Sequence, residues 1–106
     1  MSDHYILDAN NHPKQVGDLI EWAKWYSNEA ARRVGSDTDG EFTVSTVFLG
    51  LDHRFGSQGP PVLWETMVFG IENEEPCERY TSHAEAVAGH KRFCEQYLPA
   101  TVKEAM

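Results

Sequence analysis

The length and composition of the chain describe one small folded domain. Its 106 residues match a single domain, for which about 100 to 200 residues is usual. Its hydrophobic share of 41% and its three tryptophans are too high for a disordered chain and can fill a compact core. The net charge of −8 repels nucleic-acid phosphates, which argues against generic DNA or RNA binding, while it suits a basic protein partner.

The sequence carries no targeting or membrane signal. The segment 1–4 lacks the basic start of a signal peptide, and no apolar stretch approaches the roughly 20 residues needed to cross a bilayer. The two cysteines, Cys77 and Cys94, form no CxxC pair, so a disulfide framework is not indicated. We therefore expect a cytoplasmic protein with reduced thiols and no membrane partner.

The first part of the chain predicts a strand and one helix. The apolar run 5–7 is followed by the turn formers of 8–13 and predicts a brief strand. From Asp18, a plausible N-cap, apolar residues recur at helical spacing. The expected apolar stripe contains Leu19, Trp22, Ala23, Tyr26 and Ala30. We expect this helix to carry Arg32 and Arg33 in its last turn and the glycine-containing segment 35–40 to form a loop.

The middle of the chain predicts two strands at the centre of a sheet. Segments 42–51 and 62–70 are dense in β-branched and aromatic residues, as strands with a buried face are. The connection 52–61 holds two glycines and two prolines and is too long for a tight hairpin. We therefore expect an exposed loop at the edge of the sheet.

The last part of the chain predicts a short strand over 77–81 and a second helix. Ser82 and Glu85 have the spacing of a capping box, and the helix should extend to about Leu98. Its apolar stripe contains Ala86, Val87, His90, Phe93, Cys94 and Tyr97. We expect residues 99–106 to be a frayed tail.

Together these elements predict a single α+β domain over residues 1–106. The expected order is β-α-β-β-β-α, with two helices packed on one face of a mostly antiparallel sheet of three to four strands. The order of the strands within the sheet does not follow from this pattern.

Three segments of the chain resemble a recurrent small protein family of tailed bacteriophages and prophages. They are 44–56 (VSTVFLGLDHRFG), 60–70 (PPVLWETMVFG) and 79–90 (RYTSHAEAVAGH). The likeness extends to 22–25 (WAKW) and 32–34 (RRV), so it covers most of the chain. It implies a phage or prophage origin and action in the bacterial host cytoplasm. It transfers no catalytic residue, and origin alone does not fix function.

One set of side chains offers acid, base and metal-ligand chemistry. The set contains Asp52, His53, Glu65 and His90. A histidine beside carboxylates can act as a general base, or the group can hold a metal that activates water. Strand alternation places Glu65 on a largely apolar face of its strand, so its carboxylate needs a hydrogen-bond partner or a counter-charge. The candidate partners are Arg79, Arg54, His53 and His90, and a structural ion pair is the favoured interpretation.

A zinc site is a weaker alternative. Its ligands would be Cys77, His83, His90 and Cys94. His90 and Cys94 are four residues apart in a helix and share a face. Because no ligand pair has CxxC spacing, we interpret His90 as a core histidine beside Gly89 and expect neither a metal nor another cofactor.

Aromatic and basic residues also suggest a binding surface. Trp22 and Trp25 point to different sides of one helix, so we expect Trp25 to reach the surface and anchor an interface. Further expected contacts to a partner or ligand are Arg54, Phe55, Thr66, Arg79 and Tyr80. For a nucleotide, an aromatic ring would stack on the base and arginines such as Arg32 and Arg33 would hold phosphate.

Three functions follow, in descending order of preference. The first is a small acidic phage protein, non-enzymatic and capable of forming a homodimer, that inhibits a host or anti-phage defence protein by occlusion. The second is a sponge that binds a nucleotide-like signal at a subunit interface. The third is a small metal-dependent hydrolase built on the catalytic set. No GxGxxG or P-loop motif occurs, so a nucleotide site would use scattered residues.

Overall fold

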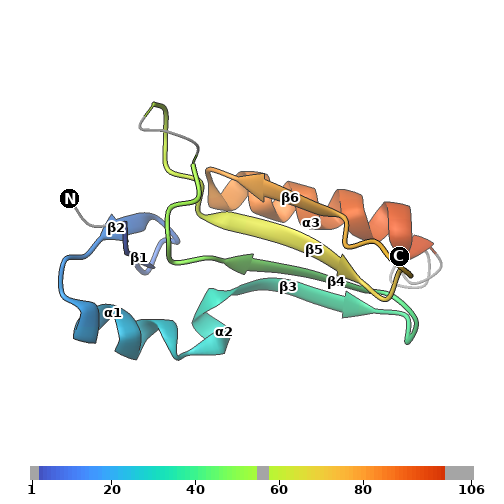
Figure 1. Ribbon diagram of the computed structural model, residues 1–106, viewed down its shortest axis with the longest axis horizontal. Coiled ribbons are helices and arrows are strands. Elements are labelled where there is room, and N and C mark those ends of the chain that lie inside the picture. The colour runs from blue at the N-terminus through green and yellow to red at the C-terminus, as the bar shows by residue number, and fades with distance from the viewer. Residues whose placement is uncertain (1–2, 55–57, 100–106) are drawn as a thin grey trace.

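The computed structural model describes residues 3–54 and 58–99 and confirms the predicted α+β class. A four-stranded antiparallel sheet, a two-stranded hairpin and three helices make up this part of the chain (Figure 1). The elements are β1 Tyr5–Leu7, β2 Pro13–Gln15, α1 Leu19–Tyr26, α2 Glu29–Arg32, β3 Arg33–Thr38, β4 Thr43–Phe48, β5 Trp64–Phe69, β6 Cys77–Tyr80 and α3 His83–Tyr97. Among the described residues, each helix is too short or too polar to span a bilayer.

The N-terminal strand is confirmed, and it pairs with a second strand that the sequence did not predict. β1 and β2 form an antiparallel hairpin whose turn is held by Asp8, since its Oδ1 accepts hydrogen bonds from the backbone N–H groups of Asn10 and His12. These two bonds lower the pKa of the Asp8 carboxyl. Every residue of β2 is exposed, so no apolar alternation marked it as a strand.

The first predicted helix is correct at its start and wrong at its end. Asp18 is the N-cap, and its carboxylate accepts hydrogen bonds from the N–H groups of Ile20 and Glu21. The helix stops at Tyr26, after which Asn28 caps the short α2.

Strand β3 occupies the segment that was predicted to be the last helical turn and a loop. It pairs with β4, and a bulge lies between Arg33 and Gly35. Gly, Ser and Asp have low strand propensity, so the sequence Gly35-Ser36-Asp37 does not indicate a strand. Pairing with β4 stabilises this segment as an edge strand.

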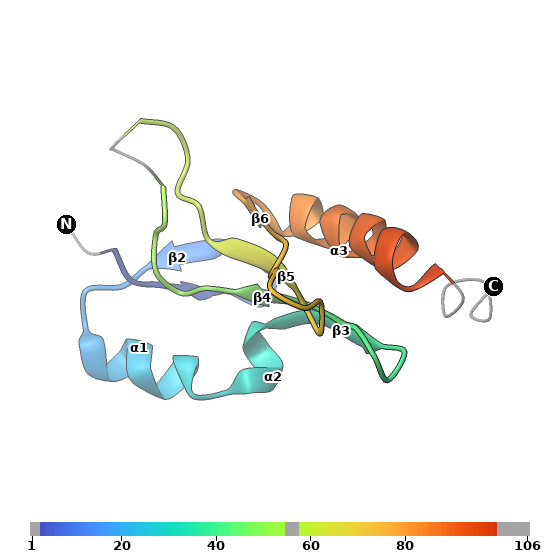
Figure 2. The same ribbon diagram turned by 45° about the vertical axis from the view of Figure 1, so that its right-hand side comes forward.

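Helix α1 packs more loosely than the predicted apolar stripe implied. None of its residues is buried, and Leu19 is 59% exposed. Its aromatic side chains are half-buried: Trp22 stacks on Tyr26 and its Nε1 donates a hydrogen bond to the carbonyl of Gly50. α1 lies at the end of the molecule away from the C-terminal end of α3 (Figure 2).

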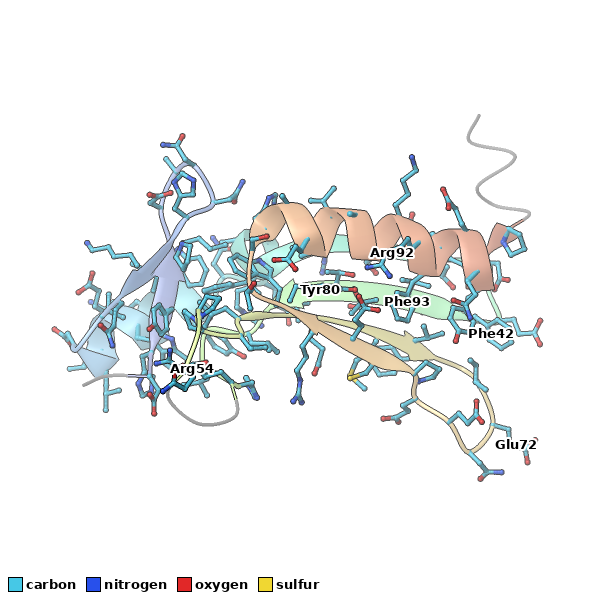
Figure 3. The ribbon with its side chains drawn as sticks, turned by 90° about the horizontal axis from the view of Figure 1, so that it is seen from above. Phe42, Arg54, Glu72, Tyr80, Arg92 and Phe93 are labelled. Atoms are coloured by element: carbon cyan, nitrogen blue, oxygen red, sulfur yellow. The ribbon has the colours of Figure 1, made fainter. Side chains whose placement is uncertain are left out.

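The main sheet has the order β3-β4-β5-β6, so the two strands predicted to be central are central. Helix α3 begins at the predicted N-cap, Ser82, and packs across all four strands (Figure 3). Tyr80 and Phe93 lie between the helix and the sheet.

Val87, which was predicted to lie on the apolar stripe of α3, is instead largely exposed. Except for Pro99, the expected frayed tail lies outside the described residues.

The sheet therefore has one covered face and one open face. The covered face packs against α3 and carries two apolar clusters, one around Val44 and Val68 and the other around Phe48 and Trp64. The open face carries the alternate side chains of the same strands. Among the described helices, α2 borders this face at one corner, where its Glu29 and Arg32 lie near Ser36 of β3 and Ser45 of β4.

Candidate functional site

A chain of hydrogen-bonded side chains crosses the covered face between the two apolar clusters. His90 links Asp37, 2.6 Å from its Nε2, to the hydroxyl of Thr46, 2.7 Å from its Nδ1. The Thr46 and Thr66 hydroxyl oxygens are 2.5 Å apart, and the Tyr80 hydroxyl donates to Thr66 over 2.9 Å. The five residues come from β3, α3, β4, β5 and β6, so this polar chain ties every strand of the sheet to the helix.

Two glycines make room for this polar chain. A Cβ atom at Gly35 would lie 2.7 Å from Nε2 of His90, closer than side chains pack, so β3 can approach the imidazole only because this residue is glycine. A Cβ atom at Gly89 would overlap the Tyr80 hydroxyl. Helix α3 can therefore approach the Tyr80 ring closely at this position.

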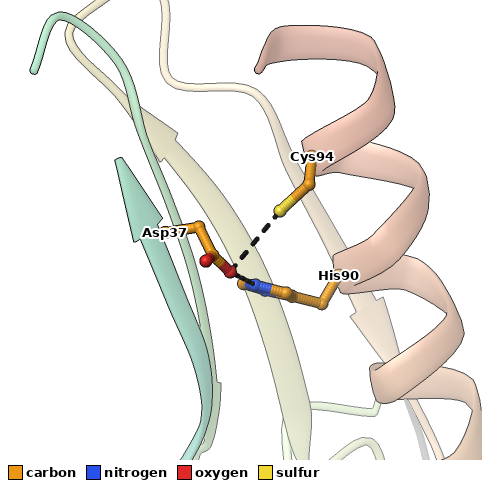
Figure 4. Close-up of side chains that lie close together, drawn as sticks. All are labelled: Asp37, His90 and Cys94. Atoms are coloured by element: carbon orange, nitrogen blue, oxygen red, sulfur yellow. Dashed lines mark hydrogen bonds and ion pairs between the residues drawn. The ribbon is translucent and has the colours of Figure 1, made fainter. Parts of the chain in front are cut away.

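Cys94 joins the polar chain at its outer end. It lies one helical turn after His90, and its Sγ is 3.7 Å from Oδ2 of Asp37 (Figure 4). Burial, together with the nearby Asp37 carboxylate, raises the pKa of the Cys94 thiol to about 11. The thiol is therefore protonated and unreactive at neutral pH.

The cluster of Asp37, His90 and Cys94 lies where α3 crosses the edge strand β3 (Figure 4). Half of the Asp37 side chain is exposed, whereas His90 is 13% exposed and Cys94 is buried. One ligand-type atom from each residue lies within 4.8 Å of the other two. Carboxylate oxygen, imidazole nitrogen and thiolate sulfur all bind divalent metals.

The order Asp37, His90, Thr46 has the connectivity of an acid–base–nucleophile triad, but its hydroxyl cannot meet a substrate. The Thr46 side chain is completely buried and its oxygen also contacts the Thr66 hydroxyl. A nucleophile must reach a reacting carbon, which this burial prevents. The inner part of this polar chain therefore has a structural role in the core.

The predicted catalytic set is not brought together. Asp52 lies at the base of the loop 52–62, where its carboxylate accepts from the N–H groups of Arg54 and Val62 and pairs with the Arg54 guanidinium at 2.7 Å. His53 is exposed, and its N–H donates to the carbonyl of Val62. These contacts close the loop.

Glu65 lies on the opposite face of the sheet from His90. Its Oε2 is 2.8 Å from Nε of Arg79, so the predicted structural ion pair is present and Arg79 is the partner. The pair also raises the pKa of the Arg79 guanidinium. Strand alternation separates the two faces, because Thr66, the next residue, points toward α3.

Half of the predicted zinc set is brought together. His90 and Cys94 share the covered side, while Cys77 is exposed on β6 with its Sγ 3.9 Å from Glu65, and His83 meets the edge of Trp64. Asp37 is the third member that sequence reasoning missed. Its segment was interpreted as a loop, and the strand pairing of β3 is what brings it to α3.

The predicted contact residues fall into different environments. Trp25, expected at the surface, is half-buried and packs edge-on against Phe48, because α1 lies over this end of the core. Thr66 and Tyr80 are buried in the polar chain and offer no surface. Arg54 is tied to Asp52 and to the carbonyl of Gly59. Phe55 lies outside the described residues, and Arg79 is exposed on the open face.

The open face presents three cross-strand rows. One row is Arg33, Val47, Glu65 and Arg79; the second is Ser36, Ser45, Met67 and Cys77; and the third is Thr38, Thr43 and Phe69.

A shallow depression of about 190 Å³ opens at one corner of the open face. It is lined by Glu29, Arg32, Arg33, Ser36, Ser45 and Val47. Within it, Arg32 lies over the Tyr26 ring while Arg33 is exposed.

Comparisons with known proteins assign no family to the chain. No family model, no curated protein and no solved structure matches it. The functional interpretation therefore depends on two features of the molecule. They are the cluster of Asp37, His90 and Cys94 at the sheet edge, and the open face with its arginine-lined depression.

Proposed function

We propose that this protein is a non-enzymatic binding protein that inhibits a host or anti-phage defence protein by covering part of its surface with the open face of the sheet. The proposal joins the phage origin implied by the sequence resemblance to the one broad surface of the described fold that no helix covers. The uncovered sheet face is the observation that carries it.

The side chains of the open face suit contact with another protein. Val47, Met67 and Phe69 lie on three adjacent rows, and Phe69 is 44% exposed. Methionine and phenylalanine are enriched in protein interfaces, where they pack against shallow pockets of a partner. The ion pair of Glu65 and Arg79 lies beside them, as polar groups do at interface rims.

The charge of this face differs from that of the whole molecule. The chain has a net charge of −8, yet the open-face rows carry Arg33 and Arg79 against the single carboxylate of Glu65. A partner that approaches this face therefore meets mixed charge around an apolar centre. We expect such a partner to present an apolar patch with at least one carboxylate to receive Arg33.

Site-specific crosslinking during infection tests the proposal. A photo-crosslinking amino acid in place of Ser45 lies on the open face, and one in place of the exposed Lys91 on α3 is the matched control. We expect a discrete crosslinked host or defence protein from position 45 and none from position 91. The purified pair should then lose affinity with Met67→Lys and with Arg33→Glu.

Several outcomes of this experiment would overturn the proposal. Equal crosslinking from both positions would mean that the open face is not the interface. Crosslinks only to a second copy of the chain would assign the face to a homodimer. Unchanged affinity in both substituted proteins would remove the sheet face from the interaction.

The depression at the corner of the open face favours a second candidate function, the nucleotide-signal sponge. Arg32 and Arg33 lie beside the hydroxyl groups of Ser36 and Ser45, and guanidinium and hydroxyl groups together bind phosphate oxygens. Native mass spectrometry with added AMP or inorganic phosphate tests it. A retained ligand that is lost in Arg33→Ala and kept in Arg92→Ala would support the sponge, and no retained ligand would reject it.

A further inference from the structure

We propose that Asp37, His90 and Cys94 form a binding site for a divalent metal ion of the zinc class, which clamps the edge strand β3 to helix α3. The ligand atoms are a carboxylate oxygen of Asp37, Nε2 of His90 and Sγ of Cys94 (Figure 4). This site is independent of the binding function of the open face, because it lies at the opposite side of the sheet.

The distances between the ligand atoms suit tetrahedral zinc. With zinc bonds of about 2.0 Å to nitrogen or oxygen and about 2.3 Å to sulfur, neighbouring ligands lie about 3.3–3.6 Å apart. The 3.7 Å between Sγ of Cys94 and Oδ2 of Asp37 is close to this spacing. The Asp37 carboxylate is 2.6 Å from Nε2, so it must retreat by less than about 1 Å to admit the ion. Its half-exposed side chain has room for that movement.

The polar chain behind His90 provides the support that a metal-binding histidine needs. Zinc-bound imidazoles usually donate their second ring N–H to an oxygen, which fixes the ring and the tautomer. Thr46 offers that oxygen 2.7 Å from Nδ1, and Thr46 itself contacts Thr66. In the metal-free protein Nε2–H donates to the Asp37 carboxylate, so metal binding requires the ring to change tautomer. Nε2 then gives up its proton and binds the metal, and Nδ1, which takes up a proton, donates its N–H to Thr46.

The ligand set also indicates which metals the site would accept. Magnesium and calcium prefer oxygen ligands alone, whereas a mixture of sulfur, nitrogen and oxygen suits zinc and cobalt. The three protein ligands leave the fourth position to water, on the exposed side of Asp37. On binding, the Cys94 thiol loses its proton to solvent and the thiolate forms the bond to the metal.

Cobalt(II) spectroscopy of the chelator-treated protein tests the site, because cobalt bound to a thiolate gives a charge-transfer absorption in the near ultraviolet. We expect this absorption in the unmodified protein and in Cys77→Ser, which removes the exposed cysteine on the other face. Cys94→Ser should abolish it, and zinc should displace the cobalt. Absence of the band, loss of the band in Cys77→Ser, or its persistence in Cys94→Ser would overturn the proposal.

Two further variants test the carboxylate ligand and the hydroxyl that supports the imidazole. Asp37→Asn changes a half-exposed side chain, so the metal-free protein should keep its melting temperature while zinc affinity falls. Thr46→Val removes the hydroxyl behind His90 and should weaken zinc binding about 10–100-fold while the thiolate band remains at saturating cobalt. Unchanged zinc affinity in both variants would reject the site.

Discussion

The two faces of the main sheet are made by the same strands and have opposite characters. On the face toward α3, Phe48 and Trp64 are completely buried, and the hydroxyl groups of Thr46, Thr66 and Tyr80 are hydrogen-bonded in sequence. On the open face, Phe69 and Cys77 remain exposed, and Glu65 pairs with Arg79 near solvent. Each strand therefore contributes stability with one set of alternate residues and leaves the other set free for binding.

This comparison separates residues that hold the fold from residues that can be changed without unfolding it. Substitutions on the covered face remove buried contacts or leave buried polar groups without partners, and both effects are costly. Substitutions on the open face change exposed or half-buried side chains, so their effects should appear more in binding than in stability. Matched pairs of substitutions on the two faces make the difference measurable.

The largest expected contrast is between two phenylalanines. Phe48→Ala removes a ring that is completely buried against Trp25 and Trp64 and should lower the free energy of unfolding by about 3–5 kcal/mol. Phe69→Ala, on the open face, should lower it by less than about 1 kcal/mol. Urea denaturation followed by circular dichroism measures both values. Similar losses for the two variants would mean that the open face is also packed in solution.

Gly89→Ala should have the next largest effect. The added Cβ would overlap the Tyr80 hydroxyl, so either the helix or the ring must move, at a cost of about 3 kcal/mol. Gly17→Ala is the control, because no heavy atom lies within 4 Å of its added Cβ and its stability should be unchanged or slightly higher. Thermal melts of the two variants compare them directly. A neutral Gly89→Ala would contradict the close contact between α3 and β6.

Thr66→Val tests the polar chain itself. Valine keeps the shape of the side chain but leaves the Thr46 and Tyr80 hydroxyls each one partner short, at an expected cost of about 1–2 kcal/mol. Thr43→Val, in β4 and facing the open side, should cost less, because its hydroxyl lies near solvent. Chemical denaturation measures the free energy of unfolding of both variants. A larger loss in Thr66→Val would mean that the polar chain stabilises the core, and equal values would mean that it is energetically neutral.

The smallest expected effect on the fold comes from labelling the two thiols. Cys77 is exposed and should react with iodoacetamide in the native protein, whereas Cys94 should react only after unfolding. Burial raises the pKa of Cys94 to about 11, which leaves roughly one thiol in a thousand ionised at pH 8. Intact mass measured over time should show a single addition, absent in Cys77→Ser. Rapid double labelling would contradict the buried position of Cys94.

The regular parts of the fold could be predicted because their signals are local. A high density of β-branched and aromatic residues marked β4 and β5, and the capping box of Ser82 and Glu85 marked the start of α3. The ion pair of Glu65 followed from strand alternation, since a carboxylate on a half-apolar face needs a counter-charge. Strands β2 and β3 were missed because exposed edge strands bury no apolar stripe.

The candidate site was only half predictable. The helical spacing of His90 and Cys94 put both on one face of α3, as the structure has them. Asp37 could not be found, since nothing in its neighbours indicated a strand. The grouping of Asp52 and His53 with Glu65 and His90 came from their positions near predicted strand ends and not from a register, and strand pairing places them apart.

By itself, the sequence determined the α+β class, the central strands, the C-terminal helix and the pairing need of Glu65. These depend on periodicity, caps and charge, which act over a few residues. Only the tertiary structure decided that an edge strand of weak propensity pairs with β4, that two glycines admit His90 and Tyr80, and that Asp37 meets Cys94. Contacts between residues more than fifty positions apart depend on how the strands and the helix pack together, and no local pattern encodes them.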